Sequence, residues 1–61
     1  MKLTILVDNV TYTPGLFAED GYSAYIEEGD LKILLDTGES GIFLQNAAKL
    51  GIDLESIDYL I

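Results

Sequence analysis

The stretch that decides the fold is residues 31–41, which reads Leu-Lys-Ile-Leu-Leu-Asp-Thr-Gly-Glu-Ser-Gly. An apolar run stops here at an acidic residue and continues as a small polar loop. In an extended chain Leu31, Ile33 and Leu35 lie on one side and Leu34 lies on the other, so both sides are apolar. We therefore predict a central strand with a layer on each of its faces. This strand delivers Asp36 to its carboxyl end, the edge at which open α/β sheets bind ligands.

Length and composition limit what the chain can be. With 61 residues it forms one domain at most, and a domain this small is marginally stable on its own. It contains no cysteine, so it cannot form a disulfide. Because it has no histidine either, none of the usual zinc-binding motifs is present. We therefore expect its stability to come from partner chains or from further sequence.

The charge balance narrows the range of partners. Eleven acidic residues against three basic ones give a formal net charge of −8, which argues against nucleic acid and anionic membranes as partners. A hydrophobic fraction of 49% is typical of a folded domain. No apolar run approaches the ~20 residues that span a bilayer, and no cleavage site follows the first apolar stretch. We expect a cytoplasmic protein.

Two strands and a long loop precede the deciding stretch. Residues 2–7 and 22–28 alternate between apolar and polar side chains, a pattern that predicts strands. A short turn around Gly29 follows the second strand, so this strand should pair antiparallel with the next one. The segment 8–21 has no sustained period and contains the only proline, which predicts a loop. It is either a functional rim or a cover over the open end of the sheet.

A helix and a last strand follow. Ser40 is a candidate N-cap and Gly51 a stop signal. On a helical wheel one face is apolar and should pack on the sheet, whereas Asn46 belongs to the polar side. The predicted members of the apolar face are Phe43, Leu44, Ala47, Ala48 and Leu50. Residues 59–61 then begin a strand, which completes a right-handed βαβ unit.

The predicted fold class is therefore α/β, a small mixed sheet in the order β-β-β-α-β with one helix packed on it. The chain stops at Ile61 within an apolar run. We interpret this end as truncation, which would leave the edges of the sheet exposed. We accordingly expect self-association through these edges.

The string Leu34-Leu35-Asp36-Thr37-Gly38 resembles the active-site string of retroviral-type aspartic proteases. That resemblance implies that Asp36 is one of two carboxylates sharing a proton, the second coming from a symmetry-related chain. Three features count against a protease fragment. They are the helix directly after Ser40, the lack of a glycine-rich flap and the lack of an Ile-Gly-Arg-like segment.

A second resemblance covers nearly the whole chain. The order of features is similar to the N-terminal part of metallo-β-lactamase superfamily hydrolases, most closely to dihydropterin-aminobenzene phosphate synthase-like proteins. The matching strings are Leu6-Val7-Asp8-Asn9, Glu19-Asp20-Gly21-Tyr22-Ser23, Ile33-Leu34-Leu35-Asp36-Thr37-Gly38, Phe43, Asn46-Ala47, Leu50-Gly51-Ile52-Asp53-Leu54 and Ile57-Asp58. The resemblance implies that residues 1–61 are a single partial domain with part of the αβ/βα fold of that superfamily.

This resemblance also implies a site that the chain does not complete. In the family the strand begun at residues 59–61 leads to a His-x-His-x-Asp-His motif whose residues bind two metal ions. We therefore expect two divalent ions, zinc, iron or manganese, and a small-molecule substrate in a full-length parent. We expect neither catalytic residues nor metal ligands in these 61 residues, and no activity from them alone.

The residues that carry over would support the site rather than form it. By resemblance, Asp36 accepts hydrogen bonds that hold the metal-binding loop, Gly38 permits the close turn after Thr37, and Asp8 and Asn9 lie at the rim of the active site. The alternative is that Asp36 and Thr37 only cap the following backbone. A different class of function also stays open, a small acidic α/β interaction module that binds partners by strand addition.

Overall fold

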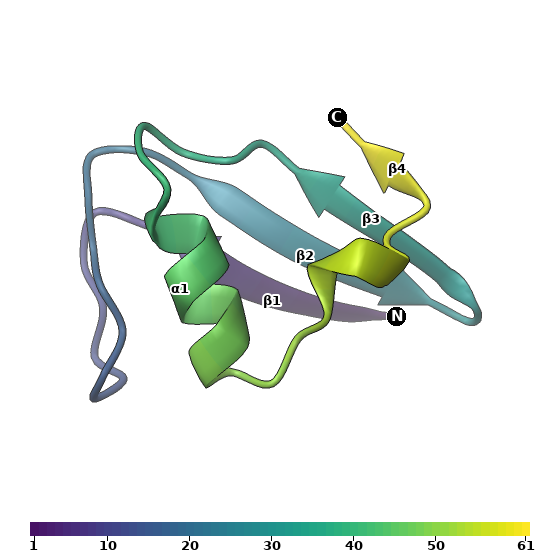
Figure 1. Cartoon of the computed structure of the whole chain (residues 1–61), viewed down its shortest axis with the longest axis horizontal. Helices are drawn as coiled ribbons and strands as arrows, with labels where there is room; N and C mark the ends of the chain where they lie inside the picture. Colours follow the sequence, from purple (N-terminus) through teal and green to yellow (C-terminus); the bar gives the residue numbers. More distant parts are fainter.

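The computed structural model describes residues 1–61 and contains a four-stranded mixed sheet with one helix on it (Figure 1). The elements, in chain order, are β1 (Lys2–Val7), β2 (Ser23–Glu28), β3 (Leu31–Leu35), α1 (Ile42–Lys49), the 3-10 turn η1 (Leu54–Ser56) and β4 (Tyr59–Leu60). The strands lie side by side in this same order, β1-β2-β3-β4. The first two pairs are antiparallel and β3 pairs with β4 in parallel. The predicted α/β class and element order are confirmed.

Gly29 sets the tightest connection of the sheet. Glu28 pairs with Leu31 across the β2–β3 hairpin, so only two residues form its turn. Gly29 has a φ of 56°, a left-handed conformation that suits glycine at the first position of such a turn. The predicted antiparallel hairpin is therefore present.

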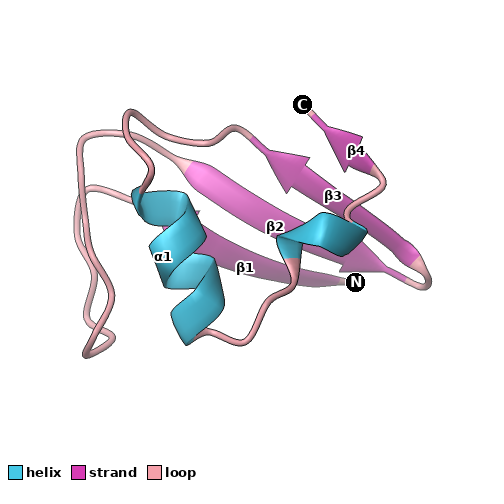
Figure 2. Cartoon of the chain, in the orientation of Figure 1, coloured by secondary structure: helices cyan, strands magenta, loops and turns pink.

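The core lies between the sheet and α1. Cross-strand partners share a face, and the pairs Thr4–Tyr25 and Tyr25–Leu34 place these residues on one face of the sheet. The helix α1 and the turn η1 both cover this face (Figure 2). The buried cluster consists of Leu6, Val7, Tyr25, Leu34 and Ala47. Partly buried side chains surround it, namely Ile42, Phe43, Ile52, Leu54 and Ile57.

Within residues 1–61 only one face of the sheet is covered, so these residues do not supply the layer predicted on the second side of β3. β3 is central, since it lies between β2 and β4. The chain, however, has only α1 and η1 to pack on the sheet, and both lie on the same side of it (Figure 1). The opposite side therefore presents apolar side chains to solvent, such as Leu3, which is 49% exposed.

The two ends of α1 are built differently. The sequence predicts Ser40 as the N-cap, but the cap position is Gly41, which has no side chain to cap the helix. The Ser40 hydroxyl donates to the Glu19 carboxylate and accepts Ile42 N–H at 3.4 Å. At the other end, Gly51 N–H donates to Ala48 O and Ile52 N–H to Ala47 O. Together with a φ of 75° at Gly51, these bonds form a Schellman motif. The predicted stop at Gly51 is confirmed.

Asn46 lies inside the protein, not on the polar side that the helical wheel predicts. Its side chain is fully buried, whereas three residues predicted to face the sheet, Leu44, Ala48 and Leu50, are exposed. The Asn46 amide donates to Leu6 O at 2.7 Å and to Phe17 O at 2.8 Å, and its Oδ1 accepts from Phe17 N–H at 2.9 Å. These three bonds join α1 to the end of β1 and to the β1–β2 loop, and they turn the helix from the orientation that polarity alone predicts.

No helix of the structure has the length and apolar character that crossing a bilayer requires.

Replacing Asn46 tests how much this amide stabilises the fold. We expect Asn46→Ala to lower the free energy of unfolding by ~2–4 kcal/mol, because it leaves the buried Leu6 carbonyl and the partly buried N–H and C=O of Phe17 without partners. Asn46→Asp keeps the shape but puts a carboxylate beside two carbonyl oxygens, so its deficit should shrink in acid, where the carboxyl regains a donor. Urea unfolding at pH 7 and pH 4 measures both effects. Gln45→Ala, at an exposed neighbouring position, is the control, and an equal loss there would contradict this role.

Candidate active-site edge of the sheet

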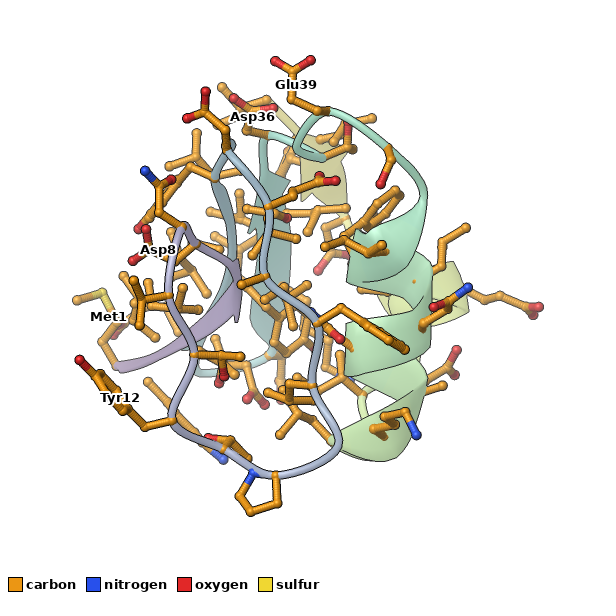
Figure 3. All side chains as sticks on the ribbon, turned by 90° about the vertical axis from the view of Figure 1, so that its left-hand side faces the viewer. Met1, Asp8, Tyr12, Asp36 and Glu39 are labelled. Carbon is orange, nitrogen blue, oxygen red and sulfur yellow. The ribbon has the colours of Figure 1, made fainter.

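The carboxyl ends of β1, β3 and β4 meet at one edge of the sheet. β1 and β3 are both antiparallel to β2, and β4 is parallel to β3, so these three strands run in the same direction. Asp8 follows β1 and Asp36 follows β3 at this edge. Figure 3 shows the edge from outside, with Asp36 and Glu39 on the same side of the molecule and Asp8 apart from them. The structure therefore brings the predicted site residues to one edge without joining them into one cluster.

Asp36 is held from both neighbouring strands. Its N–H donates to Ile61 O at 2.7 Å, and its carbonyl accepts the Ser23 hydroxyl at 2.7 Å. Its φ is 60°, in the left-handed region that Asp and Asn enter more readily than most residues. The strand ladder thus ends at Asp36 with a sharp change of direction, which turns its side chain out of the sheet.

Only one oxygen of the Asp36 carboxylate forms hydrogen bonds within the protein. Oδ1 accepts the N–H groups of Thr37 at 2.6 Å and Gly38 at 3.2 Å, which closes a local turn. No hydrogen bond from the protein reaches Oδ2, and the residue is exposed. Half of the carboxylate therefore caps the turn, while the other half is available to a group outside these 61 residues.

Glu19 fastens the loop that follows Asp36. Its Oε2 accepts the N–H groups of Glu39 at 2.8 Å and Ser40 at 3.0 Å, and its Oε1 accepts the Ser40 hydroxyl at 2.5 Å. These bonds, led by that of the Ser40 hydroxyl, hold the pKa of the Glu19 carboxyl below its ordinary value. Sequence reasoning did not assign this role to Glu19, because its partners lie 20 and 21 residues away and no local pattern marks the pairing.

Gly38 is confined by the same contact. It has a φ of 78°, and a Cβ on it would lie 2.7 Å from Glu19 Oε2 and 3.4 Å from Val7 Cγ1. A Cβ on Gly21, in turn, would lie 3.2 Å from Glu39 N. The loop after β3 and the end of the β1–β2 loop are therefore packed backbone to backbone, and the role predicted for Gly38 in a close turn agrees with this geometry.

Asp8 and Asn9 lie on the same edge but belong to the β1–β2 loop. Asp8 Oδ1 accepts Asn9 N–H at 2.8 Å, and Asp8 O accepts Glu19 N–H at 3.1 Å. No hydrogen bond or ion pair joins either residue to Asp36. The two residues thus end β1 and begin the loop.

The β1–β2 loop folds back over the end of β1 and borders an open pocket of about 260 Å³. The pocket is lined by side chains of β1, the loop and α1: Ile5, Leu6, Asp8, Val10, Thr11, Tyr12, Thr13, Leu16, Phe17 and Asn46. Of the two roles left open for this loop, a cover for the sheet end agrees with the position of Leu16 and Phe17. The exposed carboxylate of Asp8 gives the same loop a polar rim.

The side chains present do not fit a metal centre. No three His, Cys, Asp or Glu side chains lie together in a group that could hold a metal ion. The carboxylates nearest the edge, those of Asp8, Glu19 and Asp36, accept backbone N–H groups instead. No catalytic step through a metal can therefore be built from these residues.

An α/β sheet that ends in an Asp-Thr-Gly turn at its carboxyl edge agrees with part of a β-lactamase-type hydrolase fold. The structure is similar to the crystal structure of Tm1679, a metal-dependent hydrolase of the beta-lactamase superfamily, with a TM-score of 0.73 and 37% sequence identity. That match covers 95% of this chain and 20% of Tm1679. No protein-family model matches the chain.

A second similarity comes from the sequence. The chain is 39% identical over 59 residues to the uncharacterized protein MJ0448 of Methanocaldococcus jannaschii, a match that covers 97% of this chain and 23% of that protein. The chain thus spans about a fifth of the length of the proteins it matches. Both similarities include the Asp36 turn, because they extend over nearly all of the chain, and the structural one supports the β-lactamase superfamily.

Replacing Gly38 tests the packing of the loop. Gly38→Ala meets both a left-handed φ and a Cβ clash, so we expect it to lower the free energy of unfolding by ~2–3 kcal/mol. Gly51→Ala is the matched control, since Gly51 has a φ of 75° but nothing within 4 Å of its Cβ position. It should cost ~1 kcal/mol. Thermal and urea unfolding measure the difference, and equal losses would show that the Glu19 contact does not confine Gly38.

The lowered pKa of Glu19 predicts an acid-sensitive loop. A carboxyl whose folded-state pKa is depressed stabilises the fold above its unfolded value, here 4.5, and this stabilisation is lost as the pH falls through the folded value. Glu19→Gln cannot titrate, so its stability should fall less than that of the parent chain below pH 4.5. Glu39→Gln, which removes an exposed carboxylate beside the loop, should leave the parent profile intact. If the stability of the parent chain and of Glu19→Gln fell equally with pH, the Glu19 carboxylate would not be the acid-sensitive group.

Proposed function

We propose that this chain is the N-terminal part of a metal-dependent hydrolase of the metallo-β-lactamase superfamily and is not catalytic by itself. The observation that carries the proposal is the 37% identity to Tm1679 over 95% of the chain, together with a TM-score of 0.73. The donor set supports the second half of the proposal: the chain has no histidine or cysteine, and its Asp and Glu side chains form no group of three that could hold a metal ion.

In this proposal the Asp36 turn supports a metal site whose ligands come from elsewhere. Asp36 accepts hydrogen bonds from the metal-binding loop, for which its Oδ2 is available, while Oδ1 keeps the turn closed through Thr37 and Gly38. Asp8 and Asn9 form part of the rim. We expect two divalent ions, zinc, iron or manganese, and a small-molecule substrate in the longer protein, in a branch similar to the dihydropterin-aminobenzene phosphate synthase-like proteins.

A second proposal concerns partners. We propose that the chain associates with itself, as expected for a small domain with exposed apolar strands. The observation in its favour is β4, where Tyr59 is 60% and Leu60 62% exposed. The same strand would serve an interaction module that binds other chains by strand addition. A cytoplasmic location is consistent with the lack of cysteine and is part of the same proposal.

The gene sequence beyond the Ile61 codon tests the hydrolase proposal directly. We expect a His-x-His-x-Asp-His string within about a dozen codons, because β4 points toward the Asp36 edge and would deliver the motif there. An immediate stop codon would overturn the proposal.

In the longer protein, Asp36→Asn should lower zinc affinity by about 10–100-fold, the usual effect of removing a group that orients a metal ligand. Asparagine keeps Oδ1 as the acceptor for the turn, so the fold is preserved. Competition with a chromogenic chelator measures the affinity. Asp30→Asn, in the β2–β3 turn at the opposite edge, is the control, and unchanged affinity in Asp36→Asn would exclude the supporting role of Asp36.

A further inference from the structure

The carboxyl ends of β1 and β3 are not neighbours in the sheet, because β2 lies between them. Asp8 follows the first of these strands and Asp36 the second, and Figure 3 shows the two side chains apart from each other. The β1–β2 ladder is also irregular beside Asp8, since its register shifts between Ile5 and Val7. The position of one strand end relative to the other therefore depends on contacts outside the sheet.

Glu19 forms hydrogen bonds on both sides of this gap. Its N–H donates to Asp8 O at 3.1 Å, which attaches its main chain to the end of β1. Its carboxylate accepts the N–H groups of Glu39 at 2.8 Å and Ser40 at 3.0 Å, together with the Ser40 hydroxyl. One residue thus connects the end of β1 directly to the loop that follows β3.

Close packing extends this connection to the Asp36 turn. A Cβ on Gly38 would lie 2.7 Å from Glu19 Oε2, so the carboxylate fills the space beside this glycine. The Gly38 N–H in turn donates to Asp36 Oδ1 at 3.2 Å. On the other side, a Cβ on Gly21 would lie 3.3 Å from Gly38 Cα. The turn therefore cannot move toward the β1–β2 loop without displacing Glu19.

We infer that Glu19 is a positioning residue, which fixes the Asp36 turn relative to the end of β1. It acts through the loop backbone and forms no hydrogen bond with the side chain of Asp8 or Asp36. The inference rests on the proposed function, in which Asp36 supports the site and Asp8 belongs to its rim. It adds the group that sets the spacing of the two, and with it the direction of the free Asp36 Oδ2.

No basic group helps to hold the Glu19 carboxylate. The only ion pair of the structure joins the N-terminal ammonium to the end of β2. The charged groups next to Glu19 and on the segments packed against it are all acidic, namely Asp8, Asp20, Asp36 and Glu39. Hydrogen bonds alone therefore keep the carboxylate in place, and they are strongest while it is ionised. The connection should weaken when Glu19 is protonated.

Hydrogen exchange followed by NMR tests the inference at three amides, those of position 19, Thr37 and Gly38. Glu19→Ala should lower all three protection factors by a common factor of roughly ten, equivalent to one charged hydrogen bond. Glu19→Gln keeps an acceptor in the same place and should restore most of this protection. In the parent chain protection at Thr37 and Gly38 should fall below pH 4.5, whereas in Glu19→Gln it should not follow this titration.

Two further variants complete the test. Glu39→Gln removes a neighbouring carboxylate but keeps the bonded N–H, so it should leave the protection unchanged. Ser40→Ala removes one of the three bonds to Glu19 and should cause a smaller loss at the same amides, which provides the test if Glu19→Ala does not fold by circular dichroism.

Loss of protection at Glu39 and Ser40 alone, with Thr37 and Gly38 unchanged, would show that Glu19 only caps the loop and would overturn the inference. The gene sequence beyond the Ile61 codon decides the hydrolase proposal separately, so either can fail without the other.

Discussion

The fold depends on one buried amide. The side chain of Asn46, on α1, forms hydrogen bonds with the end of β1 and with the β1–β2 loop. All of its polar atoms are satisfied, and no buried side-chain polar atom of the protein lacks a partner. In a domain with so few fully buried residues, such a network specifies a single arrangement of loop and helix where apolar packing alone would leave several.

A second hydrogen-bond network, centred on the Glu19 carboxylate, depends on that of the Asn46 amide. Because Asn46 fixes the β1–β2 loop near Phe17, Glu19 is brought to the loop after β3, where it binds the Glu39 and Ser40 backbone. The turn that presents Asp36 is thus held at both ends, by Ser23 and Ile61 on the strand side and by Glu19 on the helix side. Such preorganisation is what a group that supports a metal-binding loop requires.

Local features were predictable from the sequence. Alternation located β1 and β2, Gly29 located the hairpin, and Gly51 located the end of α1, because each depends on residues within a few positions. The burial of Asn46 was not predictable, since its partners lie 29 and 40 residues away. The Glu19 contacts depend in the same way on distant residues.

The left-handed backbone of Asp36 limits which residues can replace it. With a φ of 60°, the position accepts glycine, asparagine and aspartate far more readily than other residues, whatever chemistry the site performs. Glycine would lose the bonds to Thr37 and Gly38, and asparagine would keep an acceptor but lose the charge. An aspartate retained at this position therefore reports selection for its charge, whereas exchange with asparagine would report selection for the turn alone.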